Sequence, residues 1–312
     1  MSTYLITGGA GFIGSHIVEQ LVSNGEKVRV LDNLSTGKID NIKPFESSID
    51  FIEGDILDEK ILFDAVKDVD FICHNAALPS VARSVEDPLP TNDINIRGTL
   101  NVLMAAKKNK VKRVVFASSS SVYGNTEVLP KVETMSPQPL SPYAVSKITG
   151  EYYLNNFWVN YGLKTVSLRY FNVFGPRQNP KSDYAAVIPS FISNIISKKA
   201  PTIYGDGLQT RDFTYVGNVV EANLKACTEE LSEYGVAINV CTGGRISIND
   251  IFNLIAKITG SNIKAEYGQQ RAGDVRDSQG DITRINNILK INEMISLEEG
   301  LEKTIDWYTK NT

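Results

Sequence analysis

The chain has 312 residues, of which 42% are hydrophobic and 22% charged, and its formal net charge at pH 7 is −4. This composition is typical of a soluble globular protein with a sizeable core, and the acidic balance argues against a nucleic-acid partner. Three scattered cysteines and two histidines are too few for a disulfide framework or a zinc site. The first residues lead directly into an apolar run without a basic segment or a cleavage site. We therefore expect a cytoplasmic enzyme with no metal and no membrane contact.

The first half of the chain alternates short β-rich runs with helix-length segments. The expected strands are Tyr4–Thr7, Lys27–Leu31, Asp50–Glu53, Val69–His74, Val111–Ala117 and Thr165–Tyr170. The expected helices are Phe12–Asn24, Asp58–Lys67, Asn92–Asn109 and Pro142–Tyr161. Strands alternating with helices of this length imply βαβ units. We predict an α/β fold with a Rossmann-type doubly wound parallel sheet.

After about residue 175 proline and glycine become denser, and the pattern changes. Helices are expected at 188–198, 216–231 and 247–260, with only short extended pieces between them. We predict one domain over residues 1–174, to which later segments return, and a smaller mixed α/β domain over residues 175–312.

A glycine-rich loop joins the first expected strand to the first expected helix. Gly8, Gly11 and Gly14 allow a tight turn and bring the helix N-terminus close to a pyrophosphate. Asp32 ends the second strand, 18 residues after Gly14. Its carboxylate can accept hydrogen bonds from a ribose 2′-hydroxyl and would repel a 2′-phosphate. Asn33 follows with no arginine beside it, so the sequence predicts NAD rather than NADP, with an ordinary glycine-rich turn as the alternative.

The spacing of these three glycines resembles that of the short-chain dehydrogenases/reductases. Asp55, after the third expected strand, is a weaker candidate for binding the adenine amine. An aspartate that only stabilises a turn or a helix start is an equally good interpretation.

Tyr143 and Lys147 are the candidate reactive pair. Ser141 and Pro142 have the character of a helix N-cap and first position, which puts the pair on one helix face with a rise of about 6 Å between them. We expect the lysine, together with the positive ring of NAD⁺, to lower the pKa of the tyrosine so that it can act as a base. An ordinary Tyr–Lys helix pair is the alternative.

Four serines, 118–121, follow the fifth expected strand. The carboxyl end of a strand in a doubly wound sheet is where ligands bind, and hydroxyls there can contact the sugar oxygen that exchanges a proton. A polar loop is the alternative.

Together these motifs resemble the extended short-chain dehydrogenases/reductases that act on nucleotide sugars, and most of all the UDP-hexose 4-epimerases. The resemblance covers essentially the whole chain. Its markers are GGAGFIGS from Gly8, DNLSTG from Asp32, HNAA from His74, the serine run, Tyr143 with Lys147, RYFNVFGP from Arg169 and RAGDVR from Arg271.

The resemblance implies a role for individual residues. Ser119 is the catalytic hydroxyl, Tyr143 is the base, and Lys147 orients the cofactor and Tyr143. The residues implied at the NAD site are Gly8, Gly11, Phe12, Ile13, Gly14, Asp32, Asn33, Leu34, Ser35, Thr36, Gly37, Asp55, Ile56, Ala76, Ala77, Ser118, Tyr143, Lys147 and Tyr170. Those implied at the UDP-sugar site are Ser80, Ser119, Ser120, Ser121, Tyr143, Asn172, Val187, Tyr204, Arg211, Arg271, Asp274 and Ser278.

The diphosphate of such a substrate requires cations. Arg211 and Arg271 can provide them, although each could instead be a surface salt-bridge residue. We expect Arg177 to lie at the surface.

The mechanism that the resemblance implies has no net redox change. Tyr143 removes the C4 hydroxyl proton as hydride passes from C4 to NAD⁺, the resulting 4-keto sugar turns over, and hydride returns to its opposite face. The protein is therefore expected to be an isomerase.

Other activities on the same fold remain alternatives. A nucleotide-sugar 4,6-dehydratase is disfavoured, because these enzymes carry an Asp-Glu pair after the catalytic hydroxyl, where this chain has Ser120 and Ser121, which cannot do that acid–base work. A UDP-glucuronate 4-epimerase or decarboxylase is an alternative that needs a cation for the C6 carboxylate. A strict UDP-glucose 4-epimerase and a non-enzymatic NAD-sensing regulator are the other two, and the regulator would be expected to lack part of the Ser/Tyr/Lys set.

One position bears on the sugar. Aligned on Gly273 and Asp274, Ser278 falls where the glucose/galactose-only epimerases carry a bulky tyrosine beside the C2 substituent. A serine leaves room for an acetamido group, so we predict UDP-GlcNAc/UDP-GalNAc interconversion, with UDP-Glc/UDP-Gal also accepted. The alternative is a plain loop serine.

Related enzymes dimerise through a four-helix bundle built from two helices per subunit. These match residues 92–109 and 142–161, so a homodimer is expected.

Overall fold

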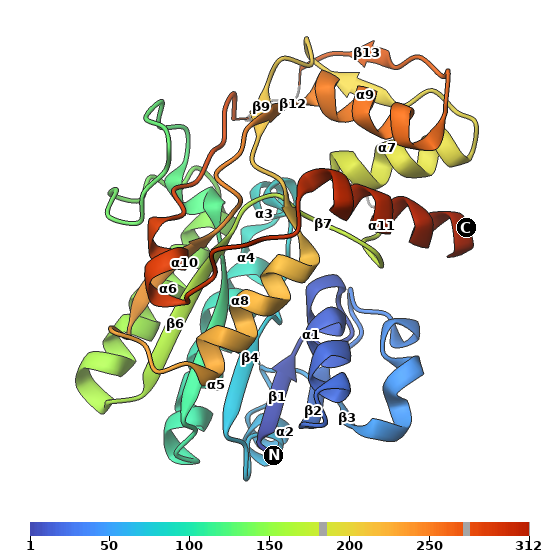
Figure 1. Cartoon of the computed structure of the whole chain (residues 1–312). Helices are drawn as coiled ribbons and strands as arrows, with labels where there is room; N and C mark the ends of the chain where they lie inside the picture. Colours follow the sequence, from blue (N-terminus) through green and yellow to red (C-terminus); the bar gives the residue numbers. More distant parts are fainter. Residues whose placement is uncertain (181–185, 271–274, 312) are drawn as a thin grey trace.

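The computed structural model describes residues 1–180, 186–270 and 275–311. Its centre is a seven-stranded sheet with the order β11-β6-β5-β4-β1-β2-β3, in which every neighbouring pair is parallel (Figure 1). The strands are β1 (Thr3–Thr7), β2 (Lys27–Asp32), β3 (Ile49–Glu53), β4 (Phe71–His74), β5 (Arg113–Ser119), β6 (Lys164–Tyr170) and β11 (Val236–Val240). The strand order reverses between β1 and β4, so the predicted doubly wound sheet is confirmed.

Helices cover both faces of this sheet. One face packs against α1 (Phe12–Ser23), α8 (Val216–Thr228) and α10 (Thr283–Ile288), and the other against α2 (Glu59–Ala65), α5 (Gly98–Lys108) and α6 (Pro142–Tyr161). Consecutive strand residues point to opposite faces, so Val114 joins one core cluster and Val115 the other. Two apolar layers of this kind explain why the strands contain long apolar runs.

Several elements differ from the sequence-based expectations. The strand β11 was not predicted, although Val-Ala-Ile-Asn-Val has the β-branched residues of a strand. The helix expected from Asn92 begins earlier, with α4 (Pro88–Asn92), and continues through a π-helical turn over Asp93–Arg97 into α5. The helix predicted over residues 142–161 is confirmed with the same bounds.

A second group of elements lies beyond the carboxyl ends of the sheet strands (Figure 1). Its core is formed by α7 (Val187–Ile196), α9 (Ile248–Thr259) and α11 (Leu297–Asn311). Short strands complete it: β8 (Thr202–Tyr204) with β13 (Glu266–Gly268), β9 (Thr210–Arg211) with β12 (Ile246–Ser247), and β7 (Val173–Phe174) with β10 (Thr214–Tyr215). The remaining helical pieces are α3 (Val81–Glu86) and the 3-10 turns Ile39–Asn41, Lys43–Ser48 and Ser120–Tyr123.

Candidate active site

The glycine-rich loop packs closely against its neighbours. Gly8 has a φ of +69°, and a Cβ there would lie 2.7 Å from the main-chain nitrogen of Ala76. A Cβ on Gly14 would lie 2.2 Å from the carbonyl oxygen of Gly8. Gly11 is the N-cap of α1 and makes no side-chain cap, so the first N–H groups of the helix are not capped by a side chain. Such an N-terminus suits the phosphates of a dinucleotide.

Asp32 holds this loop to the end of β2. Its Oδ2 accepts a 2.9 Å hydrogen bond from the Ala10 N–H, and its Oδ1 accepts one of 2.8 Å from the Leu34 N–H. Burial raises the pKa of the carboxyl, and these two bonds oppose that rise. Each carboxylate oxygen can accept a further bond, which leaves capacity for a ribose hydroxyl.

Asp55 has a clear local role. Its Oδ1 accepts a 2.8 Å bond from the Leu57 N–H, and its Oδ2 accepts one of 2.7 Å from the Asn33 side-chain amide. These contacts favour the turn interpretation of Asp55 and fix it beside Asn33, which is exposed.

Lys147 and Tyr143 lie on the first turns of α6, whose predicted N-cap is present as a 3.2 Å bond from the Ala144 N–H to the Ser141 hydroxyl. Lys147 donates a 2.7 Å bond to the carbonyl oxygen of Ala117 and is only 3% exposed. Burial lowers its pKa to about 7. Its Nζ lies 5.7 Å from the centroid of the Tyr143 ring.

Burial has the largest effect on the pKa of Tyr143. Burial of the phenol raises its pKa, and the hydrogen bond with Ser119 lowers it by less. Burial also lowers the pKa of Lys147 and so favours the neutral form of the lysine.

The serine run divides between two roles. Ser118 points into the protein and donates to Glu151, whereas Ser119 accepts a 3.1 Å bond from the Ser121 N–H. Within the described parts of the chain, the buried Ser121 hydroxyl oxygen has no hydrogen-bond partner. A buried hydroxyl without a partner is costly, which makes Ser121 suited to a ligand.

His74 supports the glycine loop from β4. Its Nδ1 lies 2.7 Å from the Thr7 hydroxyl and its Nε2 lies 3.0 Å from the Thr99 hydroxyl. Burial, with a smaller contribution from the charge of Lys147, lowers its pKa to about 3, so the ring is neutral. This fixes the segment that leads to Ala76 and Ala77.

Three predicted substrate residues meet at the loop around β9. Arg211 follows Thr210, whose carbonyl oxygen accepts a 3.1 Å bond from the Ser278 N–H. Asn172 donates 2.9 Å to the carbonyl oxygen of Asp212. Arg271 and Asp274 lie outside the described residues.

The other predicted residues are more dispersed. Val187 begins α7, and Ser80 is the N-cap of α3 with a φ of +110°. Tyr204 lines a hollow with Gly205, Asp206, Gln209, Gln270, Val275 and Arg276. The Tyr170 phenol points into the core, where it accepts a 2.8 Å bond from Asn223.

Two residues were misjudged or missed. Arg177 is not a surface residue: its side chain is 11% exposed and contacts Glu19, His16 and the Asn41 carbonyl oxygen. The segment after β7 folds back onto α1, which no local pattern indicated. Asp212, missed by the sequence analysis, accepts hydrogen bonds of 2.8–3.1 Å from Thr242, Gly243 and Gly280. The one signal in the sequence that pointed to Asp212 as a site residue was its position directly after Arg211.

Comparison with known proteins places these features in a family. The model of the NAD dependent epimerase/dehydratase family matches residues 4–241. The chain belongs to that family. The predicted family and NAD cofactor are therefore confirmed, and the close-packed glycine loop and the Asp32 carboxylate fit that cofactor.

Individual relatives span the full chain. It is 42% identical to a putative UDP-glucose 4-epimerase of Methanocaldococcus jannaschii, over 98% of both chains. It is also 42% identical to the UDP-N-acetylglucosamine 4-epimerase from Methanobrevibacter ruminantium M1, solved with UDP-N-acetylmuramic acid. That match has a TM-score of 0.95 and covers 100% of this chain and 99% of the other. The Thermus thermophilus UDP-glucose 4-epimerase, solved with NAD, is 36% identical with a TM-score of 0.88 and 98% coverage of both.

Proposed function

We propose that this protein interconverts UDP-hexoses at C4, with UDP-GlcNAc/UDP-GalNAc as the main pair and UDP-Glc/UDP-Gal also accepted. The observation that carries the proposal is the grouping of Ser119, Tyr143 and Lys147 at the carboxyl end of β5, on the same edge of the parallel sheet as the glycine loop. Relatives of this chain named as UDP-glucose and UDP-N-acetylglucosamine 4-epimerases support it. Ser120 and Ser121, in place of an acidic pair, disfavour elimination of water.

Each reactive residue has one task. Tyr143 takes the proton from the C4 hydroxyl and returns it at the end, while Ser119 shares a hydrogen bond with the same oxygen. Lys147, anchored on Ala117, orients Tyr143 and the cofactor. The chemistry that bound NAD⁺ supplies is reversible acceptance of hydride from C4, which leaves no net redox change.

We expect the UDP moiety of the substrate to bind away from C4, the reacting carbon of the sugar. We assign NAD to the 1–174 portion with its returning segments and the UDP-sugar to the 175–312 portion. Arg211 and Arg271 neutralise the diphosphate, with Asn172, Val187, Tyr204 and Asp274 around it. This anchoring lets the keto sugar turn over without leaving the site.

The sugar preference is assigned to Ser278. Its main chain is bonded to Thr210, one residue before Arg211, so it lies near the proposed diphosphate site. A small side chain there leaves room for an acetamido group at C2.

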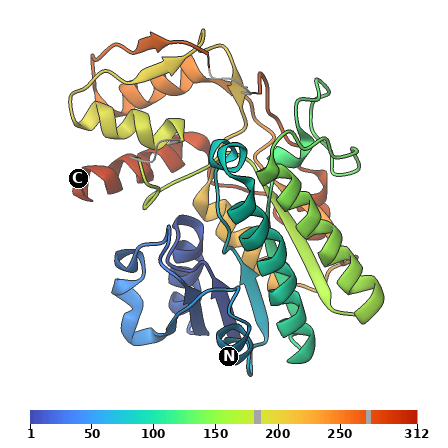
Figure 2. The ribbon, with the colours of Figure 1, turned by 180° about the vertical axis from the view of Figure 1, so that it is seen from behind.

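A homodimer and a cytoplasmic location complete the proposal. Figure 2 shows α5 and α6 side by side, in blue-green and yellow-green. Their outer faces carry Met104, Val145, Tyr152 and Val159, each at least 43% exposed. Exposed apolar side chains gathered on two neighbouring helices suit association with a second copy.

The three cysteines are free and buried, which favours a reducing compartment. In the described ranges no helix is long and apolar enough to cross a membrane.

The test is turnover of UDP-GlcNAc, UDP-Glc and UDP-glucuronate in parallel without added NAD⁺, on wild type and Ser278→Tyr. We expect wild type to epimerise both UDP-GlcNAc and UDP-Glc and Ser278→Tyr to lose only the N-acetylated one. Ser232→Tyr, at an exposed serine between α8 and β11, is the matched control and should keep both activities. Turnover of UDP-Glc alone by wild type would overturn the role of Ser278. Turnover of UDP-glucuronate alone would replace the proposed function.

A further inference from the structure

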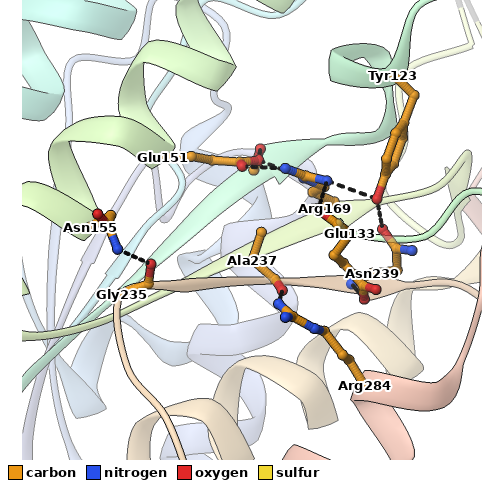
Figure 3. Close-up of polar contacts among 10 residues, drawn as sticks. Tyr123, Glu133, Glu151, Asn155, Arg169, Gly235, Ala237, Asn239 and Arg284 are labelled. Carbon is orange, nitrogen blue, oxygen red and sulfur yellow. Dashed lines mark hydrogen bonds and ion pairs between the residues drawn. The ribbon is translucent and has the colours of Figure 1, made fainter. Parts of the chain in front are cut away.

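A buried ion pair lies directly behind the proposed reactive residues. Arg169, on β6, donates to both carboxylate oxygens of Glu151, on α6, through Nε at 2.9 Å and Nη2 at 2.7 Å (Figure 3). The two side chains are 4% and 7% exposed. A buried pair with this bidentate geometry is strongly oriented, and breaking it would leave an uncompensated buried charge.

One end of the pair contacts the serine run. The Ser118 hydroxyl donates a 2.5 Å bond to Glu151, and Ser118 is the register partner of Arg169 in the sheet. Glu151 lies one helical turn after Lys147, which itself bonds to Ala117. The helix that carries Tyr143 is therefore fastened to the end of β5 at two consecutive residues, just before Ser119.

Arg169 also contacts the turn that contains the last two serines of the run. Arg169 Nη1 donates a 2.8 Å bond to the Tyr123 hydroxyl, which donates 2.7 Å to Asn239 on β11 (Figure 3). Tyr123 ends the 3-10 turn that contains Ser120 and Ser121. Asn239 is fixed in turn, because its N–H donates 2.8 Å to Glu133. The ion pair is thus linked to Ser118, at the start of the serine run, and to Tyr123, two residues after its end.

Stability alone does not account for such a pair. Replacing a buried ion pair with apolar side chains of similar volume is often neutral or stabilising for a protein. A reacting group, by contrast, must be held in one geometry, and a displacement of about 1 Å can reduce a rate about 100-fold.

We propose that Glu151 and Arg169 are positioning residues that hold Ser119 and Tyr143 in one relative geometry at the C4 hydroxyl. This inference rests on the proposed epimerase function. Neither residue touches the substrate, so their loss should reduce kcat and leave substrate binding in place.

The decisive variant is the double substitution Glu151→Leu/Arg169→Met. It removes both charges together, so we expect a Tm near that of wild type. We expect kcat to fall at least 10-fold, with KM within about 3-fold and UDP affinity by calorimetry unchanged. Wild-type kcat and Tm in this variant would overturn the proposal, because the pair would then be dispensable.

Two further variants decide the matter if the double variant does not fold. Ser118→Ala and Tyr123→Phe each cut one link and leave both charges in place, and each should reduce kcat about 3- to 10-fold at constant KM. Wild-type kcat in both would overturn the proposal.

The matched control is Arg113→Met, at the opposite end of β5. Arg113 is also 4% exposed and donates to the carbonyl oxygens of Ala226 and Glu229 and to the Tyr234 hydroxyl. Its loss should lower Tm but leave kcat within about 3-fold. An equal loss of kcat in the control would mean that any buried arginine of β5 or β6 has this effect, and would overturn the positioning role. If wild type epimerises no UDP-hexose, the proposed function itself fails and the inference fails with it.

Discussion

Lys147 donates a 2.7 Å hydrogen bond from its Nζ to the main-chain carbonyl oxygen of Ala117. Ala117 lies two residues before Ser119, so the bond ties the reactive helix to the strand that carries the reactive hydroxyl. The lysine is held by the backbone rather than by a carboxylate. Burial without a negative partner is what lowers its pKa to about 7.

The pH dependence of stability follows from that pKa. Between about 7 and its ordinary value of 10.5, the folded chain binds fewer protons at Lys147 than the unfolded chain does. The contribution of this group to stability therefore rises as the pH rises through that window. We expect the Tm of Lys147→Met minus the Tm of wild type to be largest near pH 7 and to fall toward pH 10. Thermal unfolding of both proteins across that pH range measures this difference in Tm. A difference that rises with pH would contradict this interpretation.

Tyr143 should be essential for turnover but not for folding. We expect Tyr143→Phe to lower kcat by about 100- to 10,000-fold, the range that a general acid–base group contributes. Its KM and Tm should stay close to those of wild type. Tyr152→Phe is the matched control, since Tyr152 is an exposed tyrosine on the same helix. Comparable activity in the two variants would remove Tyr143 from its proposed role.

Asp32 and Asp55 should differ in their effect on the cofactor. We expect Asp32→Asn to weaken NAD⁺ binding about 10- to 100-fold, because hydrogen bonds from a ribose to a charged carboxylate are lost. Asp55→Asn should change it less than about 5-fold, since Asp55 is engaged by Asn33 and Leu57. Calorimetry on cofactor-free protein measures the NAD⁺ affinity of both variants. Equal losses of affinity would restore Asp55 as a cofactor ligand.

Asp212 should act on substrate binding. Its carboxylate accepts bonds from three backbone N–H groups and one hydroxyl, and an asparagine would turn an NH₂ toward those donors. We expect Asp212→Asn to raise KM about 10-fold by displacing Arg211, with a smaller effect on kcat. Asp306→Asn, at an exposed site on α11, is the control for steady-state kinetics. An unchanged KM would show that the loop does not depend on the carboxylate.

The proposed dimer depends on the outer face of α6. We expect Tyr152→Glu combined with Val159→Glu to convert the protein to a monomer, because a charge at each position cannot be buried between two copies. Light scattering after size exclusion measures the mass. Val128→Glu, at an exposed apolar residue on a loop, should leave the mass unchanged. A wild-type monomer would contradict the proposal outright.

Local patterns in the sequence predicted much of the fold. The helix of residues 142–161 was predicted with its bounds because its cap, Ser141-Pro142, is adjacent in sequence. The glycine loop was predicted for the same reason. The strand β11 was missed because its place beside β6 depends on contacts between residues about 70 positions apart.

The site residues that belong to a local sequence motif could be predicted from the sequence. Glu151, Arg169 and Asp212 were missed as functional candidates because their significance comes from partners on other elements. The same holds for Arg177, whose burial depends on α1 lying across from it. The shifts in the pKa values of Lys147 and Tyr143 depend on burial, which no spacing reveals.

The measurement that tests the central claim most directly is conversion of UDP-GlcNAc by the purified protein in D₂O, followed by NMR. We expect formation of UDP-GalNAc to equilibrium with the original hydrogen retained at C4, because hydride leaves and returns within one site. Deuterium at C4, loss of water from the sugar, or no conversion of either UDP-GlcNAc or UDP-Glc by the folded protein would contradict it.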